Sequence, residues 1–196
     1  MRDDDVHASI EGSSVTRLVT KEQYFKVALG ILAAEGPGGL GIGVMCRRFN
    51  VTSGSFYHHF GNWPGFVDEL LRYWEALQVD ALRKQRFGTA GPHADIELLK
   101  QLTLGLNHRA EAAIRAWGAN DERVREVRAR VDDARRKTVQ KAVLGVVSHR
   151  DVAREITALG MAMLVGYQQI ADSVAESSLG LLLDEYVMLI SACAPK

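Results

Sequence analysis

Residues 42 to 60 constrain the fold more than any other part of the chain, because they predict two short helices joined by a tight turn. The apolar residues of the first helix recur at helical spacing and are Ile42, Met45 and Phe49. Asn50 tolerates the left-handed backbone conformation that ends a helix sharply. Thr52 or Ser53 would then cap the second helix. The pattern is typical of a helix-turn-helix.

The second helix of this pair divides into an anchoring face and a polar face. Phe56 and Phe60 lie one turn apart and would hold the helix against the first. The remaining side chains can all form hydrogen bonds and are Ser53, Ser55, Tyr57, His58 and His59. An apolar anchor that presents a polar face is the arrangement with which a helix reads base edges in a DNA groove.

Together with the segment from Thr20 to Glu35, this stretch resembles the amino-terminal DNA-binding domain of the tetracycline-repressor (TetR) family of transcriptional regulators. The family's recognition helix has the form Gly-Val-Ser-Lys-Gly-Thr-Leu-Tyr-His-His-Phe, and residues 50–60 here read Asn-Val-Thr-Ser-Gly-Ser-Phe-Tyr-His-His-Phe. At the level of motifs, the resemblance covers roughly the first third of the chain. It implies an all-α, TetR-like fold of about nine helices, with a three-helix DNA-binding domain at residues 16–63 and a ligand-binding and dimerisation domain at 64–196.

The resemblance also implies which residues contact a double-stranded DNA operator. They are Lys21, Arg47, Thr52, Ser53, Gly54, Ser55, Tyr57 and His58. Three positions depart from the family. Gly41 replaces a capping Thr, Ser53 replaces a Lys, and Gly61-Asn62-Trp63-Pro64 replaces a Lys-containing segment. Because phosphate neutralisation dominates non-specific affinity, we expect weaker non-specific DNA binding than is typical of the family.

The charge distribution restricts any DNA contact to a local surface. The formal net charge of the chain is zero, whereas the segment 16–63 carries five basic and two acidic residues, an excess of about +3. Residues 1–15 are acidic and rich in small polar residues, which predicts a disordered tail. A protein that coats nucleic acid along its whole surface would be basic.

Helical periodicity continues beyond the DNA-binding segment. A capping box at Thr20 and Gln23 opens the first helix, which ends at Gly36-Pro37. The later helices are predicted at 64–87, 93–107, 121–144, 151–173 and 178–194, with a short helix that follows residue 107 and ends at residue 117. The helix at 121–144 has one apolar face and predicts a surface helix. Its run Arg135-Arg136-Lys137 is interpreted as solvated.

The last helix is apolar on nearly all sides, and such a helix needs two packing partners. We expect one partner to be its own domain and the other a second subunit, as in the TetR family, so that the last two helices form a homodimer. The expected interface residues are Ile156, Met163, Ile170, Leu179, Leu182, Leu183, Tyr186 and Ile190. A last helix wholly buried within one subunit is the alternative.

A ligand cavity is expected among the later helices, because pockets in helical bundles are mainly apolar with a few polar groups. The candidate lining residues are Trp74, Phe87, His108, Trp117, Met161, Met163, Tyr167 and Gln168. We expect a small, largely apolar or aromatic effector with one hydrogen-bonding end. Most of these residues could equally belong to the core.

Several other functions find little support in the sequence. His93 with Glu97, or His108 with Glu111, would be half a metal site with no second cluster nearby, so no metal and no cofactor is expected. The chain has no phosphate loop or nucleophile elbow, which disfavours a helical-bundle enzyme. No membrane span or signal peptide is predicted, and a cytoplasmic location is expected. A binding protein with weakened DNA affinity on the same scaffold is the remaining alternative to a repressor.

Overall fold

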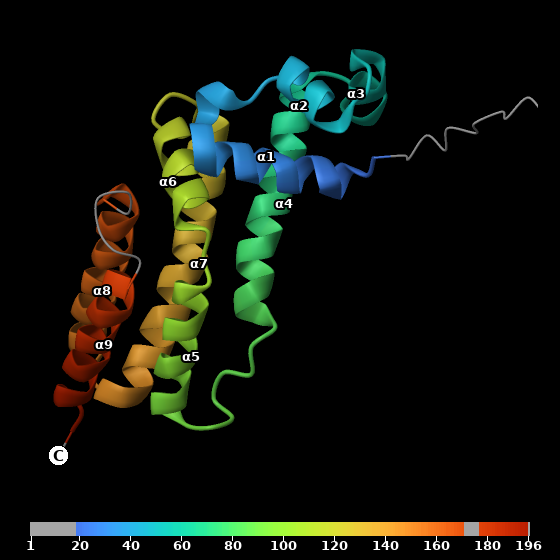
Figure 1. Cartoon of the computed structure of the whole chain (residues 1–196). Helices are drawn as coiled ribbons and strands as arrows, with labels where there is room; N and C mark the ends of the chain where they lie inside the picture. Colours follow the sequence, from blue (N-terminus) through green and yellow to red (C-terminus); the bar gives the residue numbers. More distant parts are fainter. Residues whose placement is uncertain (1–18, 171–176, 196) are drawn as a thin grey trace, which may run out of the picture.

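The computed structural model describes residues 19–170 and 177–195, so the predicted acidic tail at 1–15 lies outside the described residues. The described chain is built from α-helices and one short 3-10 turn (Figure 1). In order they are α1 (Lys21–Glu35), the turn Pro37–Gly39, α2 (Ile42–Phe49), α3 (Ser53–Phe60), α4 (Trp63–Arg83), α5 (Pro92–Leu104), α6 (His108–Trp117), α7 (Glu122–Val147), α8 (Arg150–Ile170) and α9 (Ser177–Ala192). These nine helices within the described residues confirm the predicted all-α, TetR-like architecture.

Local side-chain chemistry sets the ends of the first helices. Thr20 and Gln23 form the predicted capping box at the start of α1. Gly36 ends α1 with a φ of 69°, a backbone conformation that glycine adopts without steric cost. The side chain of Asn62 accepts a hydrogen bond from the Gly65 amide at 2.8 Å and caps α4. Pro64 occupies the first turn, where its missing N–H costs no hydrogen bond.

The first apolar core joins the DNA-binding segment to the rest of the chain. It contains Tyr24, Phe25, Ala28, Ile31, Leu32, Met45, Phe56, Phe60, Phe66, Val67, Leu70, Leu71, Trp74, Ile114, Val124, Val127 and Val131. The cluster therefore runs from α1–α4 into α6 and α7, and α1 packs directly against α6. The expected boundary after residue 63 falls in the first turn of α4, within one continuous core.

The helix α7 is central, which corrects the prediction of a surface helix. It packs against α4, α5, α6, α8 and α9 (Figure 1). Its buried side chains are the valine stripe Val124, Val127 and Val131, followed by Arg135, Ala142, Val143, Val146 and Val147. Because Arg135 is buried while Arg136 and Lys137 are exposed, the interpretation of this basic run as wholly solvated was wrong for its first member. A second core cluster around Val143 and Val147 joins α7 to α5, α8 and α9.

The helices α8 and α9 form an antiparallel pair along one side of the bundle (Figure 1). A Cβ atom at Gly160 would lie 2.5 Å from the Tyr186 ring, so α8 can approach α9 closely only because this residue is glycine. Tyr186 of α9 donates a hydrogen bond to the Ile156 carbonyl of α8 at 2.8 Å, which stabilises the packing of the two helices. None of the helices in the described part of the chain is long and apolar enough to cross a membrane.

Candidate functional site

The helices α2 and α3 form the predicted helix pair at one end of the molecule (Figure 1). Asn50 has a φ of 52° and ends α2 in the left-handed conformation, as predicted. The chain turns at Val51, and the Thr52 hydroxyl then accepts a hydrogen bond from the Ser55 amide at 3.3 Å. Of the two residues expected to cap the second helix, Thr52 is therefore the cap. Gly41, by contrast, begins α2 without any side-chain cap.

An aromatic cluster fixes the orientation of α3. Phe56 is fully buried and Phe60 is nearly so, which confirms their predicted anchoring role. The Phe66 ring of α4 lies 5.2 Å from Phe56 and 5.0 Å from Phe60, between ring centroids. Tyr24 of α1 closes the other side at 5.9 Å and 5.2 Å from the same two rings. These ring contacts hold the apolar face of α3 against α1 and α4, so its polar face is turned outward.

The outward face of α3 presents most of the expected contact residues to solvent. Tyr57 is 48% exposed, and Ser53, Gly54 and His58 are exposed beside it. Ser55 differs from the expectation, since it is half-buried. Its hydroxyl lies close enough to that of Tyr24 to offset part of the rise in the Tyr24 pKa that burial causes. The exposed surface that α3 offers is therefore narrower than the sequence suggested.

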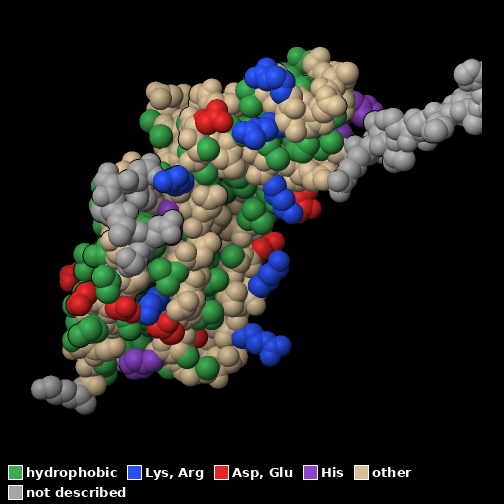
Figure 2. All heavy atoms as spheres, viewed as in Figure 1, with side chains coloured by type: hydrophobic (Ala, Val, Ile, Leu, Met, Phe, Trp, Pro, Cys, Tyr) green, Lys and Arg blue, Asp and Glu red, His purple; other side chains and the backbone are tan. Residues whose placement is uncertain are grey.

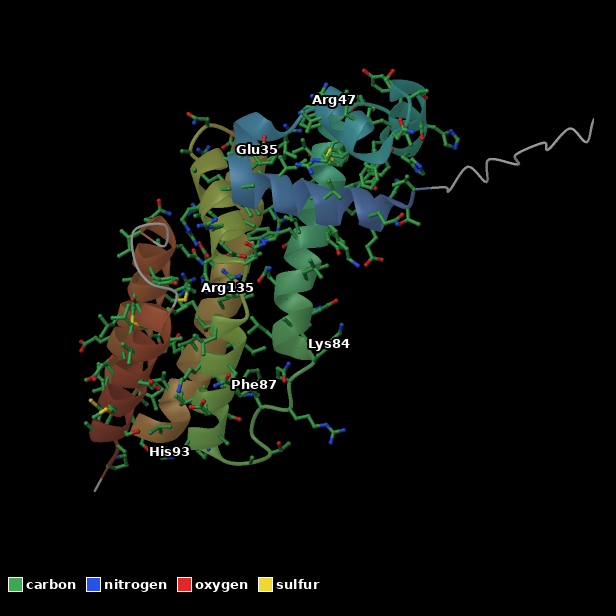
Figure 3. All side chains as sticks on the ribbon, viewed as in Figure 1. Glu35, Arg47, Lys84, Phe87, His93 and Arg135 are labelled. Carbon is green, nitrogen blue, oxygen red and sulfur yellow. The ribbon has the colours of Figure 1, made fainter. Side chains whose placement is uncertain are left out.

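Most basic side chains near α3 are already paired. The Lys21 ammonium lies 2.8 Å from the Glu69 carboxylate of α4 and 5.4 Å from the centre of the Phe60 ring. Arg48 lies 4.0 Å from Glu35. Within the described residues Arg47 has no acidic partner within salt-bridge distance, and Figure 3 shows it at the end of the molecule that carries α2 and α3. Figure 2 shows basic side chains at this end, whereas acidic ones gather over α8 and α9.

A cavity of about 100 Å³ lies between α4, α5, α7, α8 and α9. Its walls are mostly aliphatic, with polar groups from Gln78, Thr103 and Tyr186 and charged groups from Lys100 and Arg135. The apolar lining residues include Leu82, Leu99, Leu102, Val139, Val143, Met161, Met163 and Leu183. Of the residues predicted to line a ligand cavity, Met161 and Met163 do so. Phe87 instead lines a separate, open groove of about 740 Å³ between α4, α5 and α7.

The other predicted pocket residues lie outside this cavity. Trp117 packs against the first core cluster. His108 and Tyr167 contact each other edge to face, with ring centroids 5.2 Å apart. Gln168 is buried, and its amide has no hydrogen-bond partner among the described residues. Trp74 is 3% exposed and donates its indole N–H to Glu111. The prediction therefore found the cavity-lining methionines of α8, whereas two of the other residues lie on α6, which does not line the cavity.

A buried polar network beside the cavity was missed by the sequence analysis. Glu111 of α6 accepts a hydrogen bond from Trp74 Nε1 at 3.0 Å and one from Arg135 Nη1 at 2.7 Å. Arg135 Nη2 in turn donates to Gln78 Oε1 at 2.7 Å. The network ties α4 to α6 and α7, and Figure 3 shows Arg135 within the bundle. Position 135 follows Val131 at helical spacing on the apolar face of α7, and that spacing was the available signal.

The predicted dimer residues differ in whether they are buried within the chain or exposed to solvent. Ile156, Leu179, Leu183 and Ile190 are buried within the chain, and Tyr186 contacts α8 of the same chain. Met163 is half-buried and lines the cavity, whereas Leu182 and Ile170 are exposed. The large apolar residues exposed on α8 and α9 are Leu159, Ile170, Leu181, Leu182, Met188 and Leu189. Within the described residues no group of three or more His, Cys, Asp or Glu side chains is arranged to hold a metal ion.

Comparisons with known proteins identify the fold. The sequence matches no protein-family model and no curated protein sequence. A transcriptional regulator from Rhodococcus sp. RHA1 is similar in structure, with a TM-score of 0.73, 21% identity, and 90% of this chain and 98% of that chain covered. A candidate TetR-family regulator from Rhodococcus sp. gives a TM-score of 0.71 at 14% identity, with 87% and 98% covered. The regulator FadR from Bacillus subtilis, solved with stearoyl-CoA, gives 0.65 at 11% identity, with 90% and 100% covered.

The chain therefore has the fold of the TetR-family transcriptional regulators, over nearly the whole length of each of these structures. The identities are low, so the likeness concerns the fold and not a shared ligand or operator.

Proposed function

We propose that this chain is a TetR-type transcriptional repressor that binds a palindromic DNA operator as a homodimer through α3 and is released by a small, largely apolar effector. The observation that carries the proposal is the geometry of α3. Thr52 caps this helix, two buried phenylalanines anchor it, and Tyr57 and His58 are exposed on its outer face. A short helix fixed in this way presents side chains to the major groove. Such a protein would act in the cytoplasm.

The helix α4 supports a route by which an effector acts on DNA binding. At its amino-terminal end Phe66 packs on the two anchoring rings of α3, and further along Gln78 lines the cavity. An effector releases the operator only to the extent that it binds the DNA-incompetent arrangement more tightly, and the operator weakens effector binding reciprocally. The cavity supports a small effector, whereas a long acyl chain such as that of stearoyl-CoA would exceed a volume of about 100 Å³.

A second candidate function is a binding protein on the same scaffold with weak DNA affinity. The pairing of Lys21 with Glu69 and of Arg48 with Glu35 supports it, because each neighbouring carboxylate competes with a phosphate. The repressor is favoured because α3 keeps both its cap and its exposed polar face, neither of which a pure binding protein requires.

A mobility-shift assay with the DNA upstream of the chain's own gene tests the proposal. Replacing Tyr57 by Ala removes a half-exposed ring from the outer face of α3, and we expect it to cost on the order of 1 to 3 kcal/mol of operator binding. Leu104→Ala, at an exposed position at the end of α5, is the control and should bind like the wild type. Absence of a specific shift by the folded wild-type protein would favour the second candidate.

The Ser53→Lys variant tests the contact with phosphates in the same assay. The added charge should tighten binding to any DNA sequence and steepen the plot of log affinity against log salt by roughly one unit per subunit. An unchanged slope would show that Ser53 does not face the DNA backbone.

A further inference from the structure

The charged groups of the inner cavity are already neutralised by protein partners. Arg135 is 6% exposed and bonds the Glu111 carboxylate at 2.7 Å. Lys100 lies 2.6 Å from Asp184 and 3.5 Å from Glu97. A ligand carboxylate on Arg135 would compete with Glu111 and leave that buried anion without its partner, which is strongly unfavourable. On Lys100 it would compete with the two carboxylates already paired there. The cavity is therefore suited to an uncharged molecule.

The size of the cavity restricts the ligand further. Its volume of about 100 Å³ is of the same order as the ~150 Å³ of an engineered apolar cavity that binds benzene. The walls contributed by leucine, valine and methionine side chains match the surface of one hydrocarbon ring. A molecule with one ring and a short substituent fills this space, and a long chain does not.

Arg135 supplies the polar contact. Its guanidinium has five N–H donors, and Nη1 donates to Glu111 while Nη2 donates to Gln78. The Gln78 amide is half-buried on α4, lines the same cavity and holds Nη2 at 2.7 Å. A ligand oxygen that reaches Nη2 from inside the cavity replaces the Gln78 oxygen, and α4 then loses one of its two bonds to the network. Trp74 to Glu111 is the other.

We infer that the cavity between α4, α5, α7, α8 and α9 binds a neutral, ring-sized organic molecule whose oxygen accepts a hydrogen bond from Arg135 in place of Gln78. This inference rests on the proposed function, since it assigns the chemical class of the effector. It also states how binding reaches α4, through the exchange of one acceptor for another on Arg135.

The test compares three probes of equal size by isothermal titration calorimetry on the full-length protein. Acetophenone has the carbonyl acceptor, α-methylstyrene has a CH₂ group in its place, and benzoate adds a charge. Because the ketone exchanges one acceptor for another on Arg135, whereas the alkene makes no hydrogen bond of its own, we expect acetophenone to bind about threefold more tightly than α-methylstyrene. Benzoate should bind more weakly than acetophenone. Equal affinities for the ketone and the alkene, tightest binding by benzoate, or no binding of any probe would each overturn the inference.

The variant Gln78→Met tests the exchange of acceptors. Methionine has nearly the same shape as glutamine but cannot accept from Arg135 with comparable strength, so the ligand no longer competes with it. We expect several-fold tighter acetophenone binding and no change for α-methylstyrene. Gln101→Met, at an exposed glutamine on α5, is the matched control and should change neither affinity. Weaker acetophenone binding by Gln78→Met would show that Gln78 assists the ligand, against the inference.

Failure of this inference and failure of the proposed function give different results. If the ligand series behaves as expected while the operator assay shows no shift, the cavity assignment holds and the repressor proposal fails. If the operator shift is present while acetophenone binds no better than α-methylstyrene, the repressor proposal holds and this cavity assignment fails.

Discussion

His108 begins α6 and packs its half-buried ring edge-on against Tyr167 of α8. Burial lowers the pKa of this histidine below its ordinary value of 6.5, while the nearby Glu111 carboxylate opposes the shift and Arg135 adds to it. In the unfolded chain the imidazole takes up a proton near pH 6.5, and in the folded chain it does so only at lower pH. The unfolded state therefore binds more protons below about pH 6.5, so the free energy of unfolding falls as the pH falls through that window.

We predict that His108→Phe weakens this pH dependence. Phenylalanine keeps a ring against Tyr167 but does not titrate, so the variant should lose less unfolding free energy than the wild type between about pH 7.5 and pH 5.5. Urea denaturation at the two pH values measures the difference. His93→Phe, at an exposed position near the start of α5, is the control and should keep the wild-type dependence. The same pH dependence in His108→Phe as in the wild type would contradict the assignment.

At the scale of the element, α2 begins without a side-chain cap, whereas the neighbouring α3 has one. Gly41 precedes it with φ −176° and ψ 157°, extended values that any residue can adopt, and no atom lies within 4 Å of where its Cβ would be. The first N–H groups of α2 therefore lack the partner that Ser or Thr supplies at this position.

We predict that Gly41→Ser stabilises the protein by about 0.5 kcal/mol, since the hydroxyl caps α2 and the unfolded chain loses flexibility. Thermal unfolding followed by circular dichroism measures the rise. Gly36→Ser is the contrasting control, because its φ of 69° strains any residue with a side chain, and it should lower the midpoint. An unchanged or lower midpoint for Gly41→Ser would show that α2 gains nothing from a cap.

Helix ends were predictable from the sequence because their signals are local. The capping box at Thr20, the left-handed Asn50 and the proline in the first turn of α4 each act within a few residues of a helix end. The anchoring roles of Phe56 and Phe60 were also predictable, because their spacing of one turn defines a face.

The number of helices that pack around a given helix was not predictable from such local signals. The valine stripe of α7 indicated one packed face, but whether the rest of the helix is covered depends on how α5, α8 and α9 return along the chain. For the same reason the analysis missed the buried position of Arg135 and left open whether Trp74 lies in the core or lines a cavity. Both are set by helix crossings between residues far apart in sequence, as the bond between Gln78 and Arg135 illustrates.

At the scale of the whole molecule, the exposed apolar residues of α8 and α9 support the proposed homodimer. Leu182 is 41% exposed and Leu189 is 39% exposed, two helical turns apart on α9. The small residues Ala162 and Gly166 are exposed on α8 and would allow another helix to approach closely. Tyr186 is not a suitable interface residue, because its ring and hydroxyl are held within the chain by Gly160 and Ile156.

We predict that the double variant Leu182→Glu, Leu189→Glu is a folded monomer that no longer shifts the operator. Glutamates at both positions in both subunits would bring like charges together across a two-fold interface, whereas their exposure spares the core of each chain. A monomer also forfeits one of two half-sites about 34 to 36 Å apart. Sedimentation gives the mass and circular dichroism the fold. Leu104→Glu on α5 should remain dimeric, and a double variant that still sediments as a dimer would place the interface elsewhere.

The close contact between α3 and α4 links the orientation of α3 to the direction of the α4 axis. A Cβ atom at Gly65 would lie 2.5 Å from the Phe60 carbonyl oxygen, so the first turn of α4 meets the end of α3 backbone to backbone at this point. From Gly65 to Gln78 the rise of α4 is about 20 Å. If α3 and α4 move as one rigid unit, a sideways displacement of about 1 Å at Gln78 tilts α3 by roughly 3°. In the proposed homodimer the tilts would have opposite sense, so a shift smaller than a bond length inside each bundle would change the angle at which the two α3 helices approach the DNA.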